Sequence, residues 1–278
     1  MGRTAARSAG GTVKVFVTTS DWYNPLVPAF AWLFNRFWSD SQEVVILCYT
    51  PPACELPGNF SVHSLGDPVE FGNDQPEWSP GSRGRRFGEP YPTPKWSDSL
   101  KRWIDGVEDE VFILLQIDYF IHQNVNHRQI EILQKYLPHP GVVKIDLSAD
   151  RYHNPHHHFA SEDGFEVLVS DQKSRYRSSL QAAIWKRDYL AGLLKPGRSP
   201  WDFEKAAMYE QMDDGGLILG VAQPELGPVP YLNVYGGGHT NWEQLSKLDA
   251  AILEEMRKQG MIGPHWNGWA NPDGWKRC

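Results

Sequence analysis

The chain has 278 residues, a formal net charge of −7 at pH 7, 41% hydrophobic residues and 22% charged residues. This composition is ordinary for a globular protein and excludes wholesale disorder. The acidic balance argues against a surface built mainly to neutralise phosphates, because such a surface needs an excess of Lys and Arg. No apolar run approaches the length of a membrane span, so we expect a soluble or at most peripheral protein. The length favours one large α/β domain.

Cysteine usage and the first residues indicate the compartment. Cys48, Cys54 and Cys278 lack the paired spacing of a zinc site, and so few thiols are typical of a reducing, cytoplasmic environment. Residues 1–12 are basic and small without an apolar core, which predicts a flexible leader and not a secretory signal.

Strand and helix patterns alternate in the first part of the chain. The expected elements are a strand, a helix, a second strand and a short third strand at Val13–Ser20, Pro28–Trp38, Glu43–Tyr49 and Phe60–Leu65. This order predicts a parallel sheet with right-handed crossovers. Residues 66–94 are rich in Gly, Pro and charge, which predicts a long loop. Its Arg83, Arg85 and Arg86 could meet a phosphate, a nucleic-acid backbone or solvent.

The pattern continues after this loop. Helices are expected at Trp96–Gly106, Asn126–Leu137, from Pro200 onward and at Asp249–Gln259, and strands at Val111–Phe120, Gly141–Leu147, Leu217–Val221 and Tyr231–Tyr235. Ser178–Leu194 reads as a strand that turns into a helix. A polar loop is expected around His153 and His156–His158, whose consecutive histidines lack the spacing of helical zinc ligands. The tail from Gly260, with Trp266, Trp269 and Trp275, is expected to pack on the body.

The most informative segment is Val111–Phe120, in which an apolar run ends in Asp118. Such a run is typical of a strand that is buried on both faces. Because ligands of open α/β sheets lie beyond the carboxyl ends of the strands, Asp118 is expected beside a ligand site. The alternative is that Asp118 only caps the next turn.

Several motifs together resemble a known family. The helix start at Trp96–Leu100, the strand that ends at Asp118, the segment Leu180–Trp185 and the segment Ser199–Glu204 make residues 13–210 similar to small bacterial and phage glycosyltransferases of the GT-A type. The resemblance implies a single GT-A-like α/β domain over residues 13–278, with a mostly parallel central sheet flanked by helices. Its nucleotide-binding half would lie near residues 13–150 and its acceptor half near residues 151–278.

The resemblance also implies site roles. The acid after the strand would lie in the nucleotide-sugar site, and the element around Glu204 would lie on the acceptor side. Sugar transfer needs charge stabilisation at the diphosphate, so Asp118 is the expected ligand of a divalent Mg²⁺ or Mn²⁺ ion. His239 is a further candidate ligand, with packing against Trp242 as its alternative. Gln116-Ile117-Asp118 has one acid where this family often has two, which puts metal dependence in doubt.

Further residues complete the expected site. Glu204 is the candidate general base that removes the proton of the acceptor hydroxyl. The alternative is that this acid, near a helix start, only stabilises the helix by interacting with its dipole. Gln181, Trp185 and Trp201 are candidates for acceptor binding, with core packing as the alternative for either Trp. The expected donor-binding residues are Thr18, Thr19, Asp21, Asp118 and Tyr119.

The sequence therefore predicts a glycosyltransferase that moves a sugar from a nucleotide donor, expected to be a UDP-sugar, to a hydroxyl acceptor. That acceptor is a hydroxymethylated DNA base or a glycan. Two alternatives stay open, a non-catalytic module that binds nucleotide or carbohydrate and a nucleotidyltransferase. Dinucleotide-binding, kinase and serine-hydrolase motifs are absent from the sequence.

Overall fold

The computed structural model describes residues 13–66, 96–222, 227–236 and 239–262, apart from the side chains of Trp22, Asp150, Arg151, Gly236 and His239. The expected leader, most of the long loop with its three arginines, and the tryptophan-containing tail lie outside these ranges.

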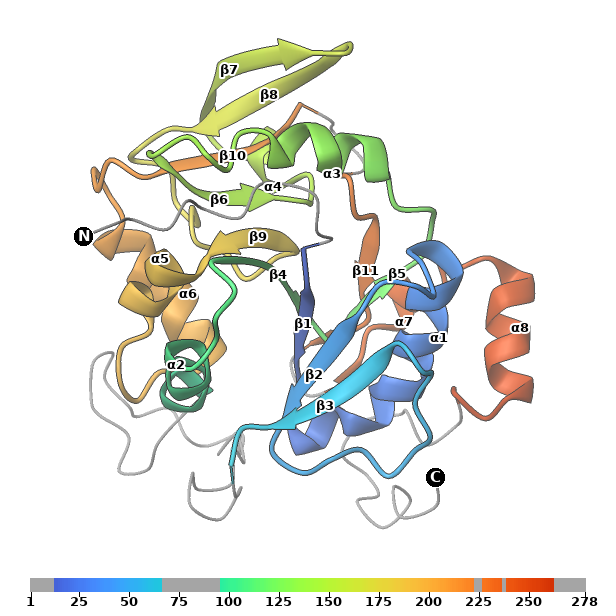
Figure 1. The fold of residues 1–278 in the computed structure, drawn as a ribbon. Coiled ribbons are helices and arrows are strands. Elements are labelled where there is room, and N and C mark those ends of the chain that lie inside the picture. Colours follow the sequence, from blue (N-terminus) through green and yellow to red (C-terminus); the bar gives the residue numbers. More distant parts are fainter. Residues whose placement is uncertain (1–12, 67–95, 223–226, 237–238, 263–278) are drawn as a thin grey trace.

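A nine-stranded sheet forms the centre of the molecule (Figure 1). In spatial order its strands are β3 (Phe60–Ser64), β2 (Val44–Cys48), β1 (Val15–Thr18), β4 (Val111–Gln116), β9 (Ala183–Lys186), β6 (Val142–Asp146), β10 (Leu217–Val221), β8 (Phe165–Ser170) and β7 (His156–Glu162). The pairings show that β9 and β8 run against all the other strands. The expected mostly parallel sheet is therefore confirmed, with these two strands as exceptions.

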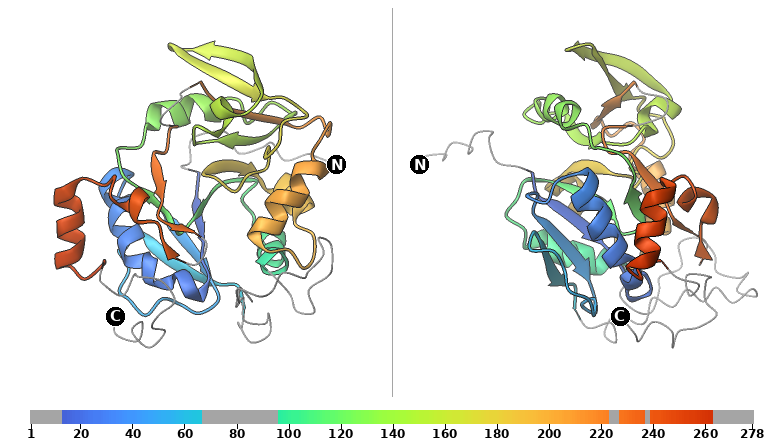
Figure 2. Two further views of the ribbon diagram at one scale, coloured as in Figure 1. Left: turned by 180° about the vertical axis from the view of Figure 1, so that it is seen from behind. Right: turned by 90° about the vertical axis from the view of Figure 1, so that its right-hand side faces the viewer.

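Helices cover both faces of the sheet (Figure 2). The core on one face includes residues of α1 (Val27–Phe37) and α3 (His127–Gln134), with α8 (Ala250–Lys258) outside α1. The core on the other face includes residues of α2 (Trp96–Asp105), α5 (Arg187–Leu193) and α6 (Pro200–Glu210). In β4, Ile113 and Leu115 belong to the first core, whereas Phe112 and Leu114 belong to the second. The apolar run before Asp118 is thus buried on both faces, as the sequence predicted.

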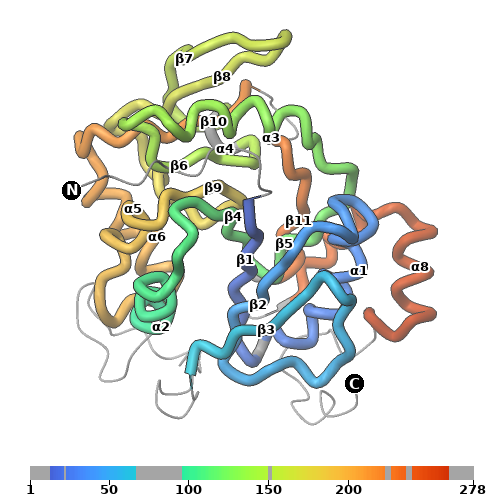
Figure 3. Tube along the Cα trace, viewed as in Figure 1, coloured from blue at the N-terminus to red at the C-terminus, as the bar shows by residue number. Residues whose placement is uncertain are grey.

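One part of the sheet was not predicted. His156–His158 lie on strand β7, which forms a hairpin with β8 at the end of the sheet (Figure 3). The turn residues Asp163 and Gly164 have φ angles of 51° and 79°, the left-handed backbone that a two-residue hairpin turn needs. The Asp-Gly pair was the sequence signal for this hairpin. Within the described residues, no group of three His, Cys, Asp or Glu side chains could hold a metal ion.

The chain leaves the central sheet where the acid stands. After β4 it turns at Ile117 and Asp118 into β5 (Tyr119–Ile121), which pairs with β11 (Tyr231–Asn233) in a separate antiparallel ladder. The hairpin of β12 (Tyr235–Gly236) and β13 (His239–Thr240) follows, and then α7 (Trp242–Leu245). The other short elements are η1 (Asp21–Leu26) and α4 (Asp150–His153). None of the described helices is long and apolar enough to cross a bilayer.

The approach of residues 227–229 to the end of β6 makes a test of this arrangement. The Val229 N–H donates to the Leu147 carbonyl at 2.8 Å, and a Cβ atom at Gly227 would lie 2.4 Å from the carbonyl carbon of Ser148. Because the three nearest atoms all belong to the backbone of Leu147 and Ser148, a side-chain rotation cannot relieve the contact. We expect Gly227→Ala to lower the free energy of unfolding by about 1–3 kcal/mol in urea denaturation.

Gly58→Ala is the matched control, because nothing lies within 4 Å of a Cβ atom there. That variant should change the free energy of unfolding by less than about 0.5 kcal/mol. Equal effects of the two substitutions would contradict the close packing of residue 227 on β6.

Candidate active site

The carboxyl edge of β1 and β4 is the point at which the strand order changes direction. The chain runs outward from β1 through β2 to β3, and then returns to place β4 on the opposite side of β1. At this edge the Thr18 hydroxyl donates to the Gln116 amide oxygen at 2.7 Å, which joins the two strand ends. Ligands of open α/β sheets bind at such switch points. Asp118 comes two residues after Gln116 and so lies at this edge.

Asp118 belongs to a group of polar side chains from three separate segments. We call Tyr23, Asp118, Asn233 and Tyr235 the Asp118 cluster. With its amide nitrogen turned toward the acid, Asn233 donates to Asp118 Oδ2 at 3.2 Å and to the Tyr235 carbonyl at 2.6 Å. The rings of Tyr23 and Tyr235 meet edge to face at 4.8 Å. The β5–β11 ladder holds the group together, since the Val234 N–H donates to the Asp118 carbonyl at 3.0 Å.

The electrostatic state of Asp118 is unusual. Burial raises the pKa of its carboxyl from 3.8 to about 7, and a hydrogen bond from its own backbone N–H opposes this rise. No cationic side chain of the described chain contributes to the shift. Burial also raises the pKa of Tyr23, and the nearby Asp118 carboxylate adds to that effect. The cluster therefore holds a carboxylate whose charge no described cation balances.

A polar cavity of about 370 Å³ lies beside the cluster. Asn233 and Tyr235 belong both to the cluster and to the wall of the cavity. Gln181 lines the same wall, and its amide oxygen accepts from the Tyr231 hydroxyl at 2.9 Å. The Tyr231 ring stacks on Tyr119 with centroids 4.2 Å apart. Tyr119 after β4, Gln181 before β9 and Ser148 after β6 thus lie in or next to the wall of one cavity.

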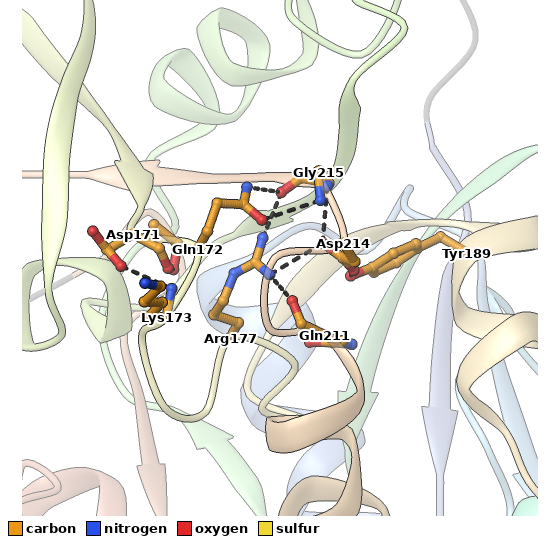
Figure 4. A network of polar contacts seen from close by, with 10 residues as sticks. Asp171, Gln172, Lys173, Arg177, Tyr189, Gln211, Asp214 and Gly215 are labelled. Carbon is orange, nitrogen blue, oxygen red and sulfur yellow. Dashed lines mark hydrogen bonds and ion pairs between the residues drawn. The ribbon is translucent and has the colours of Figure 1, made fainter.

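Buried charges hold the segment that precedes Gln181, and Figure 4 shows the contacts of one of them, Arg177. The completely buried guanidinium of Arg177 donates to the carbonyls of Gln211 and Gly216 and pairs with Asp214 at 3.1 Å. The Lys144 ammonium, also completely buried, donates to the Ser179 carbonyl at 2.7 Å. The hydrogen bonds of Arg177 and the bond from Lys144 to Ser179 hold the chain on either side of residue 178. The segment from which Gln181 extends to the cavity is therefore held in place.

Glu204 contributes to the same support. It lies in α6, which begins with a capping box formed by Ser199 and Asp202 and with Pro200 in the first turn. Its Oε1 accepts from the Leu180 N–H at 2.7 Å. Glu204 is not among the residues that line the cavity. The carboxylate therefore binds the residue next to Gln181, and its predicted role as base stays a prediction.

The predicted donor residues take up two kinds of position. Thr18 and Thr19 are buried, and the Thr19 hydroxyl donates to the Ser20 carbonyl at 3.1 Å. Asp21 is exposed and accepts from the backbone N–H and the hydroxyl of Thr50, at 3.0 and 2.9 Å. Tyr119 is buried in its stack on Tyr231.

The predicted acceptor and metal residues differ in exposure. Trp185 is completely buried, and the Lys144 ammonium lies 4.7 Å from its ring centroid, so the structure gives it the core-packing role that was its alternative. Trp201 is 57% exposed on α6. The backbone of His239 pairs with Gly236 in the β12–β13 hairpin, and its side chain lies outside the described part.

Sequence reasoning missed Tyr23, Asn233 and Tyr235. Asn233 was recognisable, because an amide in the middle of Tyr231–Tyr235 breaks an otherwise apolar and aromatic strand. Its partner could not be read from the sequence, since 114 intervening residues separate Asp118 from Asn233 along the chain.

Comparisons with known proteins give only distant likenesses. No family model and no curated protein matches the sequence. Similar solved structures include an apo UDP-glucose pyrophosphorylase (10% identity, 89% of this chain and 100% of that chain, TM-score 0.42) and a CMP:2-keto-3-deoxy-manno-octonic acid synthetase with CTP (13%, 75% and 88%, TM-score 0.37). The bifunctional glycosyltransferase WbbM is a third (12%, 92% and 46%, TM-score 0.36). Similarity this low does not identify the activity, and membership of the GT-A glycosyltransferases is not shown.

The raised pKa of Asp118 predicts a pH-dependent stability. Because its folded pKa of about 7 exceeds the ordinary 3.8, the protonated acid stabilises the fold at low pH, and this contribution is lost as the pH rises through 7. Asp118→Asn imitates the protonated acid and does not titrate. Relative to this variant, wild type should lose on the order of 2–4 kcal/mol of unfolding free energy between pH 4 and pH 8.

Urea denaturation of both proteins at several pH values measures this difference, and titrations elsewhere in the chain cancel in the comparison. Stability curves that stay parallel from pH 4 to pH 8 would show that the Asp118 carboxylate is fully solvated.

Proposed function

We propose that this chain is a transferase that takes a sugar from a uridine-type nucleotide donor and passes it to a hydroxyl acceptor. The observation that carries the proposal is Asp118, an acid with a raised pKa at the switch point of the sheet and next to a polar cavity. A site that transfers a sugar must stabilise the negative charge that develops on a departing diphosphate. The resemblance of residues 13–210 to GT-A glycosyltransferases supports the same assignment.

A divalent cation suits the chemistry of this acid. A partly buried carboxylate with no cationic neighbour among the described residues gains a counter-charge when a metal binds, and binding releases its proton. Mg²⁺ is commonly held by one or two carboxylates together with substrate phosphates, so one acid is enough. Asp118 would hold the ion, with His239 as the second candidate ligand. When bound, such an ion would neutralise charge on the diphosphate.

The residues of this chain divide into two sides around Asp118. Thr18 ends β1, Thr19 and Asp21 follow it, and all three would face the nucleotide. Gln181 in the cavity wall would face the acceptor. Asp118 follows β4, which lies between β1 and β9 in the sheet. An acid between the two substrates is where the bond to the leaving group breaks.

Reaction products test the proposal. Wild type incubated with UDP-sugars and Mn²⁺ should release UDP, and Asp118→Asn should lower the rate by roughly 10²–10³-fold, the usual loss when a group that stabilises transition-state charge is removed. Asp105→Asn removes a carboxylate that pairs with Lys101 on the surface and should leave the rate unchanged.

Other products would identify the alternatives. Pyrophosphate release from a nucleoside triphosphate with a sugar phosphate would identify a nucleotidyltransferase. A thermal shift with UDP-sugars but no turnover would identify a binding module, because a ligand of the native state raises stability by mass action. No shift and no product with any nucleotide would overturn the proposal.

Glu204 needs a test of its own, because its carboxylate can serve as base or as backbone anchor. The hydrogen bond from Leu180 favours the anchor, so we expect Glu204→Gln, which keeps an accepting oxygen, to retain most of the activity. Glu204→Ala should lower the activity, and it should lower the free energy of unfolding by about 1–3 kcal/mol, because the buried Leu180 N–H loses its acceptor. A loss of about 10²-fold or more in Glu204→Gln with unchanged stability would establish the base.

A further inference from the structure

The described wall of the cavity beside Asp118 is polar and uncharged. Its polar side chains are amides and one hydroxyl, from Ser148, Gln181, Asn233, Asn241 and Gln244. Two tyrosines, Tyr231 and Tyr235, add aromatic surface and phenol groups. Among the described residues that line the cavity there is no Lys, Arg, Asp or Glu. This composition limits which ligands the cavity can bind.

Charged ligands do not match such a wall. A phosphate or carboxylate that enters a cavity loses water and needs a cation or several directed donors in exchange. Amides and hydroxyls offer donors and acceptors in equal measure, which suits sugar hydroxyl groups that both donate and accept. Tyrosine rings add apolar faces against which the carbon side of a sugar ring packs.

The wall is held in shape before any ligand arrives. The Asn241 side chain accepts from the Gln244 N–H at 3.2 Å, and the Asn241 N–H donates to the Val234 carbonyl at 2.8 Å. Gln181 and Tyr231 fix each other through their hydrogen bond, and Asn233 bonds to Asp118. Because these groups are already oriented, a ligand would bind without the cost of ordering them.

We propose that this cavity binds an uncharged, hydroxyl-rich acceptor, the sugar unit of a glycan. The assignment rests on the proposed function, because the acceptor role follows from the neighbouring Asp118 and a donor on the β1 side. A DNA base is disfavoured as the acceptor. Its flanking phosphates would need cations near the cavity mouth, whereas the lining residues that the structure describes are uncharged and the chain has a net charge of −7.

A binding experiment tests the cavity apart from catalysis. Saturation-transfer NMR and calorimetry would compare the methyl glycosides of glucose, galactose and N-acetylglucosamine with the 6-phosphate of each sugar and with a hydroxymethylcytosine oligonucleotide. Each probe is measured with and without UDP and Mn²⁺. We expect at least one neutral glycoside to bind roughly tenfold more tightly than its 6-phosphate, since the buried phosphate would lack a partner.

Two substitutions connect the binding to this wall. Gln181→Ala and Gln244→Ala should each weaken glycoside binding by roughly tenfold, about the effect of one lost hydrogen bond. Gln259→Ala is the matched control, because that glutamine caps the far end of α8 and pairs with Glu255. It should leave the affinity unchanged.

The outcomes separate this inference from the function on which it rests. Tighter binding of a sugar phosphate or of the oligonucleotide, or no glycoside binding at all, would overturn the neutral-acceptor assignment even if UDP release continues. Glycoside binding that depends on Gln181 without turnover of any donor would instead overturn the glycosyltransferase and leave a carbohydrate-binding cavity.

Discussion

The burial of β4 on both faces is the constraint on which the rest of the site depends. Phe112–Leu115 of β4 face the two apolar cores, and the strand is paired with β1 and β9 at its sides. A charge there would need a buried partner, as Lys144 and Asp146 of β6 have in each other. The first carboxylate therefore stands where the strand ends and the chain turns out of the sheet. That turn delivers Asp118 to the β5–β11 ladder, and with it to Asn233 and Tyr235.

The buried charged residues that support the site are paired with opposite charges, whereas Asp118 in the site is not paired with a described cation. Lys144 pairs with Asp146 at 2.7 Å, and Arg177 pairs with Asp214, so the ions inside the supporting network are balanced. Such pairs contribute little net stability, but breaking one is costly because it leaves a buried charge alone. In the described chain, Asp118 has an amide as its side-chain partner and no cation. A bound cation would therefore stabilise the charge of Asp118 more than that of the carboxylates that are already paired.

Local sequence patterns predicted most of the strands near the site. β1, β2 and β4 lie within their expected ranges, because strands buried on both faces carry nearly continuous apolar runs. β6 also lies within its expected range, although Lys144 and Asp146 interrupt its apolar residues. The β7–β8 hairpin was not predicted, because its edge strand is mostly polar and the Asp163-Gly164 turn was its one local signal. The reversal of β9 between β4 and β6 had no local signal, since strand direction depends on the path of the connecting segment.

The sequence by itself determined that a buried strand ends in an acid, and hence that Asp118 stands at a strand end. Only the tertiary structure decided which groups surround this acid. Asn233, Tyr235 and Gln181 come from distant segments, and their meeting depends on the reversed β9, on the β5–β11 ladder and on the packing of Gly227 against the end of β6. Periodicity records which face of an element is buried, whereas the choice of neighbours depends on how whole elements pack together.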